Sequence, residues 1–152
     1  MFFSKPEIIS KNLKTLEDTS KAKLEIGKTV YSKSGEYVGK VYDLIFKEHV
    51  ILGFMISGKK DMFIGREYIA NESKESVVLN IEPVINLIGK QVFDATGKRI
   101  GTVSRIGRKS NANTYNEIFV KKAFYRFAFP ISKDKISVAK KNIILKNSYE
   151  SK

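Results

Sequence analysis

The residues that could carry catalytic chemistry in this chain are few and scattered. The single histidine, His49, stands between Glu48 and Val50 at the expected start of a strand, where an exposed turn residue is the simplest interpretation. Asp43 and Asp61 could meet in the fold, but nothing in their spacing requires it. Catalysis needs an activated nucleophile, a carboxylate pair or a metal cluster, and the sequence contains no recognisable motif for any of these. We therefore expect a protein that is not an enzyme and has no cofactor or metal.

Positive charge offers a second kind of chemistry, the binding of anions. The net charge is +12, and it is uneven: residues 1–87 hold 13 Lys and Arg against 12 Asp and Glu, whereas residues 88–152 hold 15 against 4. RNA, an anionic membrane surface or an acidic protein would each explain the asymmetry, and so would a lysine-rich surface that only aids solubility. The candidate residues for anion or partner binding are Arg99, Arg105, Arg108, Lys109, Lys121, Lys122 and Arg126.

Aromatic residues are interleaved with some of these cations at residues 119–130, which read FVKKAFYRFAFP. Aromatic rings can stack on bases while cations meet phosphates, so the composition suits a platform for single-stranded RNA. The alternative is a central strand of a barrel, with the large apolar residues facing the interior and the lysines on the solvent-exposed face or in an adjoining turn. We favour the strand.

These candidate residues are set in a repeated framework. Residues 26–41 read IGKTVYSKSGEYVGKV, and residues 88–103, 62 positions later, read IGKQVFDATGKRIGTV. Three glycines recur at matched positions, and we expect them to be structural: they are Gly27, Gly35 and Gly39 in the first copy and Gly89, Gly97 and Gly101 in the second. In each copy the second glycine suits a hairpin turn and the third suits a sharply bent strand.

The spacing of β-branched and aromatic residues predicts an all-β fold. Strands are expected at 50–56, 62–64 and 77–81 in the first copy and at 117–129 and 142–145 in the second. The copies end on VVL and IIL, which are 66 positions apart, whereas the copies begin 62 positions apart. The second copy is therefore four residues longer, and we place these residues in the polar loop 107–116. The sequence thus predicts two small barrels of five or six strands, at residues 25–83 and 87–146, packed on each other.

Two segments flank the barrels. Residues 1–24 predict a short amphipathic helix, because Ile9, Leu13 and Leu16 recur at helical spacing. This apolar stripe could cap a barrel end, enter a partner's groove or touch an anionic membrane. We expect residues 147–152 to form a tail.

The repeated pattern IGKxVxxxxGxxxGxV, followed by further short strands, resembles the PRC-barrel family of small SH3-like barrels. The resemblance covers residues 25–82 and 87–146 and therefore implies a tandem PRC-barrel protein. Within that family, a chain of this layout is similar to archaeal cell-division proteins of the CdpB-like type and to related stand-alone barrels. The resemblance implies an adaptor that works with a SepF-like membrane anchor of FtsZ.

Two functions stay open at this point. The first is a protein-binding adaptor, which could self-associate as a homodimer through exposed strand edges. The second is an RNA-binding or ribosome-assembly factor that uses the basic second barrel. The chain has no cysteine, and its apolar runs are only a few residues long, so we expect a cytoplasmic protein without a transmembrane segment, recruited to the membrane or the division site by a partner.

Overall fold

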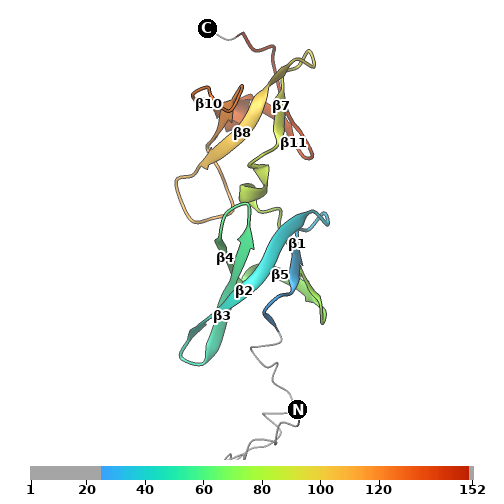
Figure 1. Ribbon diagram of the computed structural model, residues 1–152, viewed down its shortest axis with the longest axis vertical. Coiled ribbons are helices and arrows are strands. Elements are labelled where there is room, and N and C mark those ends of the chain that lie inside the picture. Colours follow the sequence, from blue (N-terminus) through green and yellow to red (C-terminus); the bar gives the residue numbers. More distant parts are fainter. Residues whose placement is uncertain (1–24, 151–152) are drawn as a thin grey trace, which may run out of the picture.

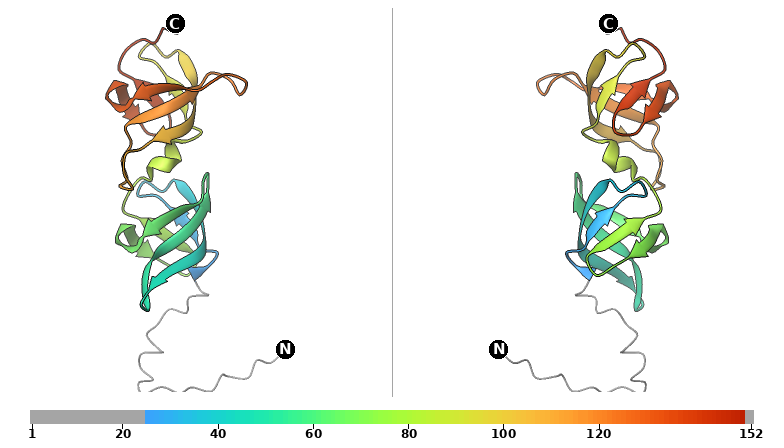
Figure 2. Two further views of the ribbon diagram at one scale, coloured as in Figure 1. Left: turned by 90° about the vertical axis from the view of Figure 1, so that its left-hand side faces the viewer. Right: turned by 90° about the vertical axis from the view of Figure 1, so that its right-hand side faces the viewer.

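Two six-stranded sheets of the same topology follow one another along the chain (Figures 1 and 2). The computed structural model describes residues 25–150. The first sheet contains β1 (Thr29–Tyr31), β2 (Tyr37–Lys47), β3 (Val50–Gly58), β4 (Met62–Gly65), β5 (Ile69–Glu72) and β6 (Ser76–Leu79). The second contains β7 (Gln91–Phe93), β8 (Arg99–Gly107), β9 (Glu117–Lys121), β10 (Phe129–Ser132), β11 (Ile136–Ala139) and β12 (Ile143–Leu145).

The strand order is the same in both sheets. It is β4-β3-β2-β1-β6-β5 in the first and β10-β9-β8-β7-β12-β11 in the second. Neighbours are antiparallel except where β1 pairs with β6 and β7 with β12, so the start and the end of each repeat lie side by side. The short 3-10 helices η1 (Arg66–Tyr68) and η3 (Lys133–Lys135) join the two edge strands of each sheet, and η2 (Val84–Leu87) links the sheets. The predicted all-β fold of two barrels is confirmed.

Each sheet rolls around an aliphatic core of its own. The first core is built on Val30, Ile56 and Val77, none of which is exposed, and the second on Val92, Ile118 and Ile143, which are equally buried. These side chains alternate with outward-facing residues along short strands, as a half-buried sheet requires. The interiors of such narrow barrels are filled by side chains, so the remaining surfaces of the molecule are the outer faces, the loops and the barrel ends.

The repeated glycines lie in turns and at close contacts between strands. Gly35 and Gly97 adopt φ values of 89° and 86°, and each closes its hairpin by donating its N–H to the carbonyl of Ser32 or Asp94, respectively. Gly39 and Gly101 lie where β2 and β8 approach a neighbouring strand closely, and a Cβ at Gly39 would overlap the carbonyl oxygen of Ser57. Gly27 and Gly89 also have positive φ values, just before the first strand of each barrel.

The register corrects the prediction that all four extra residues lie in loop 107–116. Leu44 pairs with Phe54 and Ile106 with Ile118, so the offset between the copies grows from 62 to 64 across that loop. Phe54 pairs with Ile64 and Ile118 with Ile131, which raises the offset to 67 between β9 and β10. The turn between β11 and β12 is one residue shorter than the turn between β5 and β6, so the offset between the copies falls from 67 to 66. Most of the added length lies in the β9–β10 connection.

The strand predicted at 117–129 is wrong for the same reason. β9 ends at Lys121, and β10 begins only at Phe129. Residues 122–128, which we call the aromatic loop, form a turn in which the Arg126 N–H donates to the Ala123 carbonyl at 3.0 Å. Aromatic residues that would fill a barrel if they lay on a strand therefore lie outside it.

We expect Gly39→Ala to lower the free energy of unfolding by about 3 kcal/mol, because the backbone of Ser57 cannot move away without breaking the β2–β3 pairing. Gly65→Ala is the matched control. There the added methyl meets only the flexible carboxylate end of Glu67, so the loss should stay below about 1 kcal/mol. Urea unfolding of the two variants measures the difference, and equal losses would show that the close approach of β3 does not require a glycine at position 39.

Candidate functional site

The outer face of the first barrel carries an apolar row on the adjacent strands β3 and β4, formed by Met55 and Phe63. Asp43 in β2 pairs with Met55 in β3, which in turn pairs with Phe63 in β4. The Phe63 side chain is 48% exposed, and its ring lies over Gly53, where an added Cβ would stand 2.8 Å from two ring carbons. β4 is an edge strand of its sheet. The same three strands expose further large apolar side chains, which are Tyr37, Tyr42, Phe46, Val50 and Leu52.

The equivalent row of the second barrel has a different character. Arg105, Phe119 and Pro130 occupy the positions of Asp43, Met55 and Phe63. The Arg105 guanidinium carbon lies 3.4 Å from the centre of the Phe119 ring, a cation–π contact that covers the outer face of the ring. A carboxylate in the first barrel is thus replaced by a guanidinium in the second.

Asp43 and Asp61, whose meeting the sequence left open, both lie near Tyr42. Partial desolvation raises the pKa of the Tyr42 hydroxyl, and the charges of Asp61 and Asp43 raise it further. The Asp43 carboxylate accepts a hydrogen bond from the Leu44 N–H at 2.8 Å. These two aspartates add negative charge beside the apolar row.

The candidate cations of the second barrel do not form one cluster. Arg99, at the start of β8, donates to the Lys122 carbonyl at 3.4 Å and to Thr102 Oγ1 at 3.0 Å, so it lies beside the aromatic loop together with Lys121 and Arg126. Arg108 and Lys109 follow the other end of β8, and the Arg108 guanidinium donates to the Ala112 carbonyl at 2.7 Å. Arg105 lies between the two groups, on Phe119.

The aromatic loop is the feature that sequence reasoning missed. Phe124 is 91% exposed, Tyr125 70% and Phe127 97%. Phe124 and Tyr125 meet edge to face, with ring centroids 5.2 Å apart, and the Arg126 guanidinium lies 5.6 Å from the Tyr125 ring centre. The one signal in the sequence was the pair Lys121 and Lys122, which interrupts the alternation of apolar residues.

A buried lysine occupies one end of the first barrel. Lys28 Nζ lies 2.8 Å from Glu25 Oε2 and 2.8 Å from Glu72 Oε1. Burial would lower the pKa of Lys28, but its hydrogen bonds and charge interactions with the two glutamates outweigh burial and raise it. Desolvation, assisted by the neighbouring Glu72 carboxylate, raises the pKa of Glu25, whereas hydrogen bonding lowers the pKa of Glu72.

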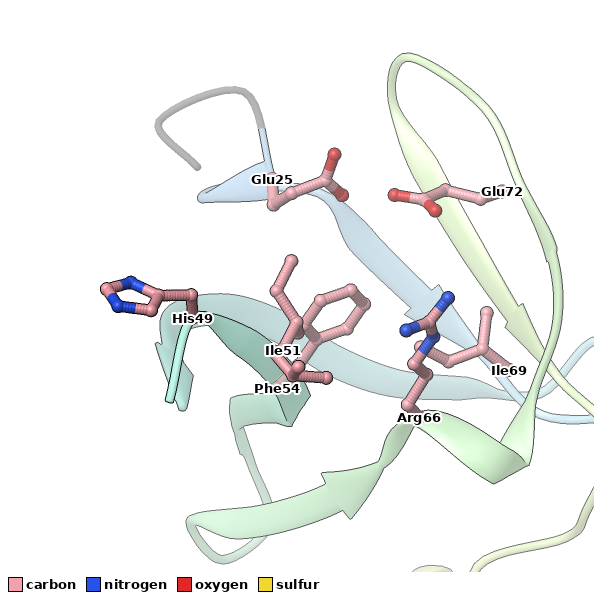
Figure 3. Close-up of a pocket in the computed structure, with 8 residues that line it drawn as sticks. Glu25, His49, Ile51, Phe54, Arg66, Ile69 and Glu72 are labelled. Carbon is pink, nitrogen blue, oxygen red and sulfur yellow. The ribbon is translucent and has the colours of Figure 1, made fainter. Parts of the chain in front are cut away.

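This ion cluster borders an open pocket, shown in Figure 3. The carboxylates of Glu25 and Glu72 face each other at one rim, while His49 points away from both (Figure 3). His49 lies in the β2–β3 turn with φ of 71° and is exposed, as predicted for a turn residue. Among residues 25–150, no three histidine, aspartate or glutamate side chains are grouped as a metal site would require. The two carboxylates at the rim of the pocket are those that bind Lys28.

The second barrel uses the equivalent lysine to hold the two barrels together. Lys90 matches Lys28, but Leu87 and Ala139 stand where Glu25 and Glu72 would be. Lys90 Nζ instead lies 3.2 Å from Glu36 Oε2, which belongs to the β1–β2 hairpin of the first barrel. The carboxylate that the second barrel has lost is thus provided by the first.

Further hydrogen bonds join the barrels at the η2 linker. Lys59 Nζ donates to the Asn86 carbonyl at 2.9 Å and also to that of Ile88. Asn113, from the β8–β9 loop, accepts from the Val84 N–H at 2.9 Å and donates to the Glu82 carbonyl at 2.8 Å. The predicted packing of one copy on the other is therefore present, and it is polar. The predicted helix with Ile9, Leu13 and Leu16 lies outside the described residues.

Comparison with known proteins agrees with this architecture. The PRC-barrel domain family matches residues 19–85 and again residues 82–152. Because the two matches together cover most of the chain, the protein belongs to the PRC-barrel family, with two barrels in tandem. Comparison with the curated proteins finds no match to the chain. Among residues 25–150, no helix is long and apolar enough to cross a membrane.

We expect Lys28→Met to destabilise the first barrel by about 3 kcal/mol at pH 7, because it leaves the buried Glu25 carboxylate beside Glu72 without a cation. The deficit should shrink as the pH falls from 7 to 5. Lys28 lowers the pKa of Glu25, so its removal raises that pKa above the wild-type value. The folded variant therefore takes up a proton at Glu25 more readily than the folded wild type, and this uptake favours its folding as the pH falls.

Thermal unfolding at both pH values measures the effect. Lys74→Met, at an exposed position in the β5–β6 turn, is the control and should change stability little at either pH. A deficit in the Lys28 variant that is the same at pH 7 and pH 5 would contradict the assignment of the buried charges.

Proposed function

We propose that this protein is a non-catalytic adaptor that binds other proteins through the outer surfaces of its barrels. The observation that carries the proposal is the apolar row of the first barrel, with half-exposed Phe63 on the edge strand β4. Membership of the PRC-barrel family agrees with a role as an interaction module. The orientation of His49, away from Glu25 and Glu72, supports the non-catalytic part.

The apolar row has the features of a protein-binding surface. Large side chains with a rigid backbone beneath them bury area at a low entropic cost, and Phe63 is held over Gly53 in this way. The neighbouring edge of β4 presents backbone groups that an incoming strand can pair with. Asp43 and Asp61 favour a partner with positive charge at the rim of the contact.

The more specific proposal is a role in archaeal-type cell division, with a SepF-like membrane anchor of FtsZ as the partner. It rests on the resemblance to archaeal PRC-barrel division proteins. In this role the protein acts in the cytoplasm and reaches the division site through its partner.

The rival function is RNA binding or ribosome assembly by the basic second barrel. The outward ring on β9, Phe119, is covered by Arg105, and this weighs against base stacking on the sheet. Arg99 and Arg108 already donate hydrogen bonds to groups of the chain itself, which leaves fewer of their donors for phosphates. The cations could still meet phosphates, and this would appear as RNA affinity that falls steeply with salt.

Capture from the native lysate with the full chain as bait tests the adaptor proposal, followed by titration of the purified SepF-like protein. We expect Phe63→Asp to weaken that binding by roughly thirtyfold or more, as loss of a central interface residue does. Phe127→Asp makes the same chemical change on the second barrel and should leave the affinity unchanged. Capture of ribosomal subunits, with salt-sensitive RNA binding unaffected by Phe63→Asp, would contradict the proposal.

Self-association of the protein is a separate expectation. The outer edge of β4 has no strand partner within residues 25–150, and pairing with the same edge of a second copy would satisfy its backbone groups. Light scattering over a range of concentrations should reveal a homodimer at the higher ones. A mass that stays monomeric at millimolar protein would remove this expectation.

A further inference from the structure

The aromatic loop concentrates more exposed aromatic surface than any other connection among residues 25–150. Three of its seven residues, Phe124, Tyr125 and Phe127, are between 70% and 97% exposed. Soluble domains seldom leave neighbouring aromatic side chains in water unless another surface covers them. In Figure 2 the orange connection from β9 stands out from the body of the second barrel, so its aromatic side chains sit on a projection.

Cations surround the base of this projection without matching anions. Lys121 and Lys122 precede the aromatic residues, Arg126 lies among them, and Arg99 reaches the Lys122 carbonyl from β8. The sequence contains no aspartate or glutamate from 118 to 133. Among the described residues, ion pairs are formed by Lys28 and Lys90, and none of them includes a residue of the aromatic loop. The surface that covers this loop should therefore be negatively charged.

The comparison of the two barrels shows that the loop is an addition to the fold. Its counterpart in the first barrel is the short β3–β4 connection, residues 59–61, whose Lys59 is used to hold the linker. The second barrel has three more residues here by register, and its loop makes no contact of that kind with the linker. The extra length serves neither barrel closure nor barrel pairing.

We propose that the aromatic loop inserts Phe124, Tyr125 and Phe127 into the interfacial region of an anionic membrane. Aromatic rings favour the boundary between headgroups and acyl chains, and Lys121, Lys122, Arg126 and Arg99 then lie at the depth of the lipid phosphates. The exposed aromatic side chains can enter the interface of an anionic membrane while the surrounding cations contact its headgroups.

The geometry of the rings separates this proposal from RNA binding. A platform for single-stranded RNA presents its rings side by side along a groove, so that successive bases stack on open faces. Here Phe124 meets Tyr125 edge to face at 89°, Arg126 lies near the Tyr125 ring, and Phe127 makes no ring contact with either. The rings therefore do not form a track along which successive bases could stack.

The experiment uses the full chain, which contains no tryptophan, so that a single introduced tryptophan reports its own surroundings. Phe127→Trp is mixed with vesicles of phosphatidylcholine alone or with about one third phosphatidylglycerol. We expect a blue shift of the tryptophan emission and quenching by lipids brominated on the acyl chains, with the anionic vesicles only. Phe63→Trp, on the first barrel, is the matched control and should show neither change.

Vesicle flotation gives the affinities. Phe127→Asp should weaken binding to the anionic vesicles by about tenfold or more, and Lys121→Gln and Lys122→Gln by about fivefold each. Phe63→Asp should have no effect, so that failure of membrane binding and failure of the adaptor proposal are separate results. Circular dichroism of each variant checks that the fold is intact.

Three outcomes would overturn the proposal. The first is vesicle binding that Phe127→Asp leaves unchanged, because the loop would then not be inserted. The second is binding of the Phe127→Trp variant without a blue shift or quenching of its emission, which would mean surface attraction alone. The third is an emission change of the same variant with single-stranded oligouridine in the absence of any change with anionic vesicles, which would assign the loop to RNA.

Discussion

The barrels are too narrow to hold anything but their own side chains, and every functional surface of the molecule follows from this constraint. Val30, Ile56 and Val77 in one copy, and Val92, Val120 and Ile143 in the other, are closed off from solvent. A substitution that changes their volume disturbs the packing, whereas the outside of each strand is free to vary. Two copies of one framework can therefore keep the same interior and differ in what they present to partners.

The two copies differ in this way at three matched places. On the outer sheet face, Asp43 of the first barrel becomes Arg105 in the second. At the barrel end, Lys28 is neutralised within its own barrel, whereas Lys90 takes Glu36 from the neighbouring barrel. The connection after β3 is short and faces the linker, whereas the one after β9 is long and aromatic. The first barrel thus offers an apolar surface with negative charge, and the second an aromatic projection with positive charge.

Much of the fold could be predicted from the sequence because the signals were local and repeated. The hairpin glycines Gly35 and Gly97 and the strand glycines Gly39 and Gly101 each act on their immediate neighbours, and their recurrence fixed the tandem architecture. The position of the extra residues could not be predicted, because FVKKAFYRFAFP has the composition of a strand and only the pairing of Ile118 with Ile131 shows that the middle is a loop.

The polar contacts between the barrels also could not be predicted from the sequence. Lys90 and Glu36 are 54 positions apart, and either could have served as a solvated surface charge. The candidate cations were chosen by type alone, so nothing in the sequence separated Arg99, beside the aromatic loop, from Arg108 at the opposite end of β8. Surface groups are brought together by the turns of the fold, and their spacing along the chain carries little of that information.

The central claim is that the protein works by its outer surfaces around sealed interiors. Amide and methyl NMR spectra of the labelled chain, recorded with and without a binding partner, test it most directly. The account predicts that a partner shifts signals from outward residues such as Phe63 and Met55 and leaves the methyl groups of Val30 and Val77 in place. Large shifts of those buried methyl groups on addition of a small molecule would contradict it, because they would mean that the barrel opens to take a ligand inside.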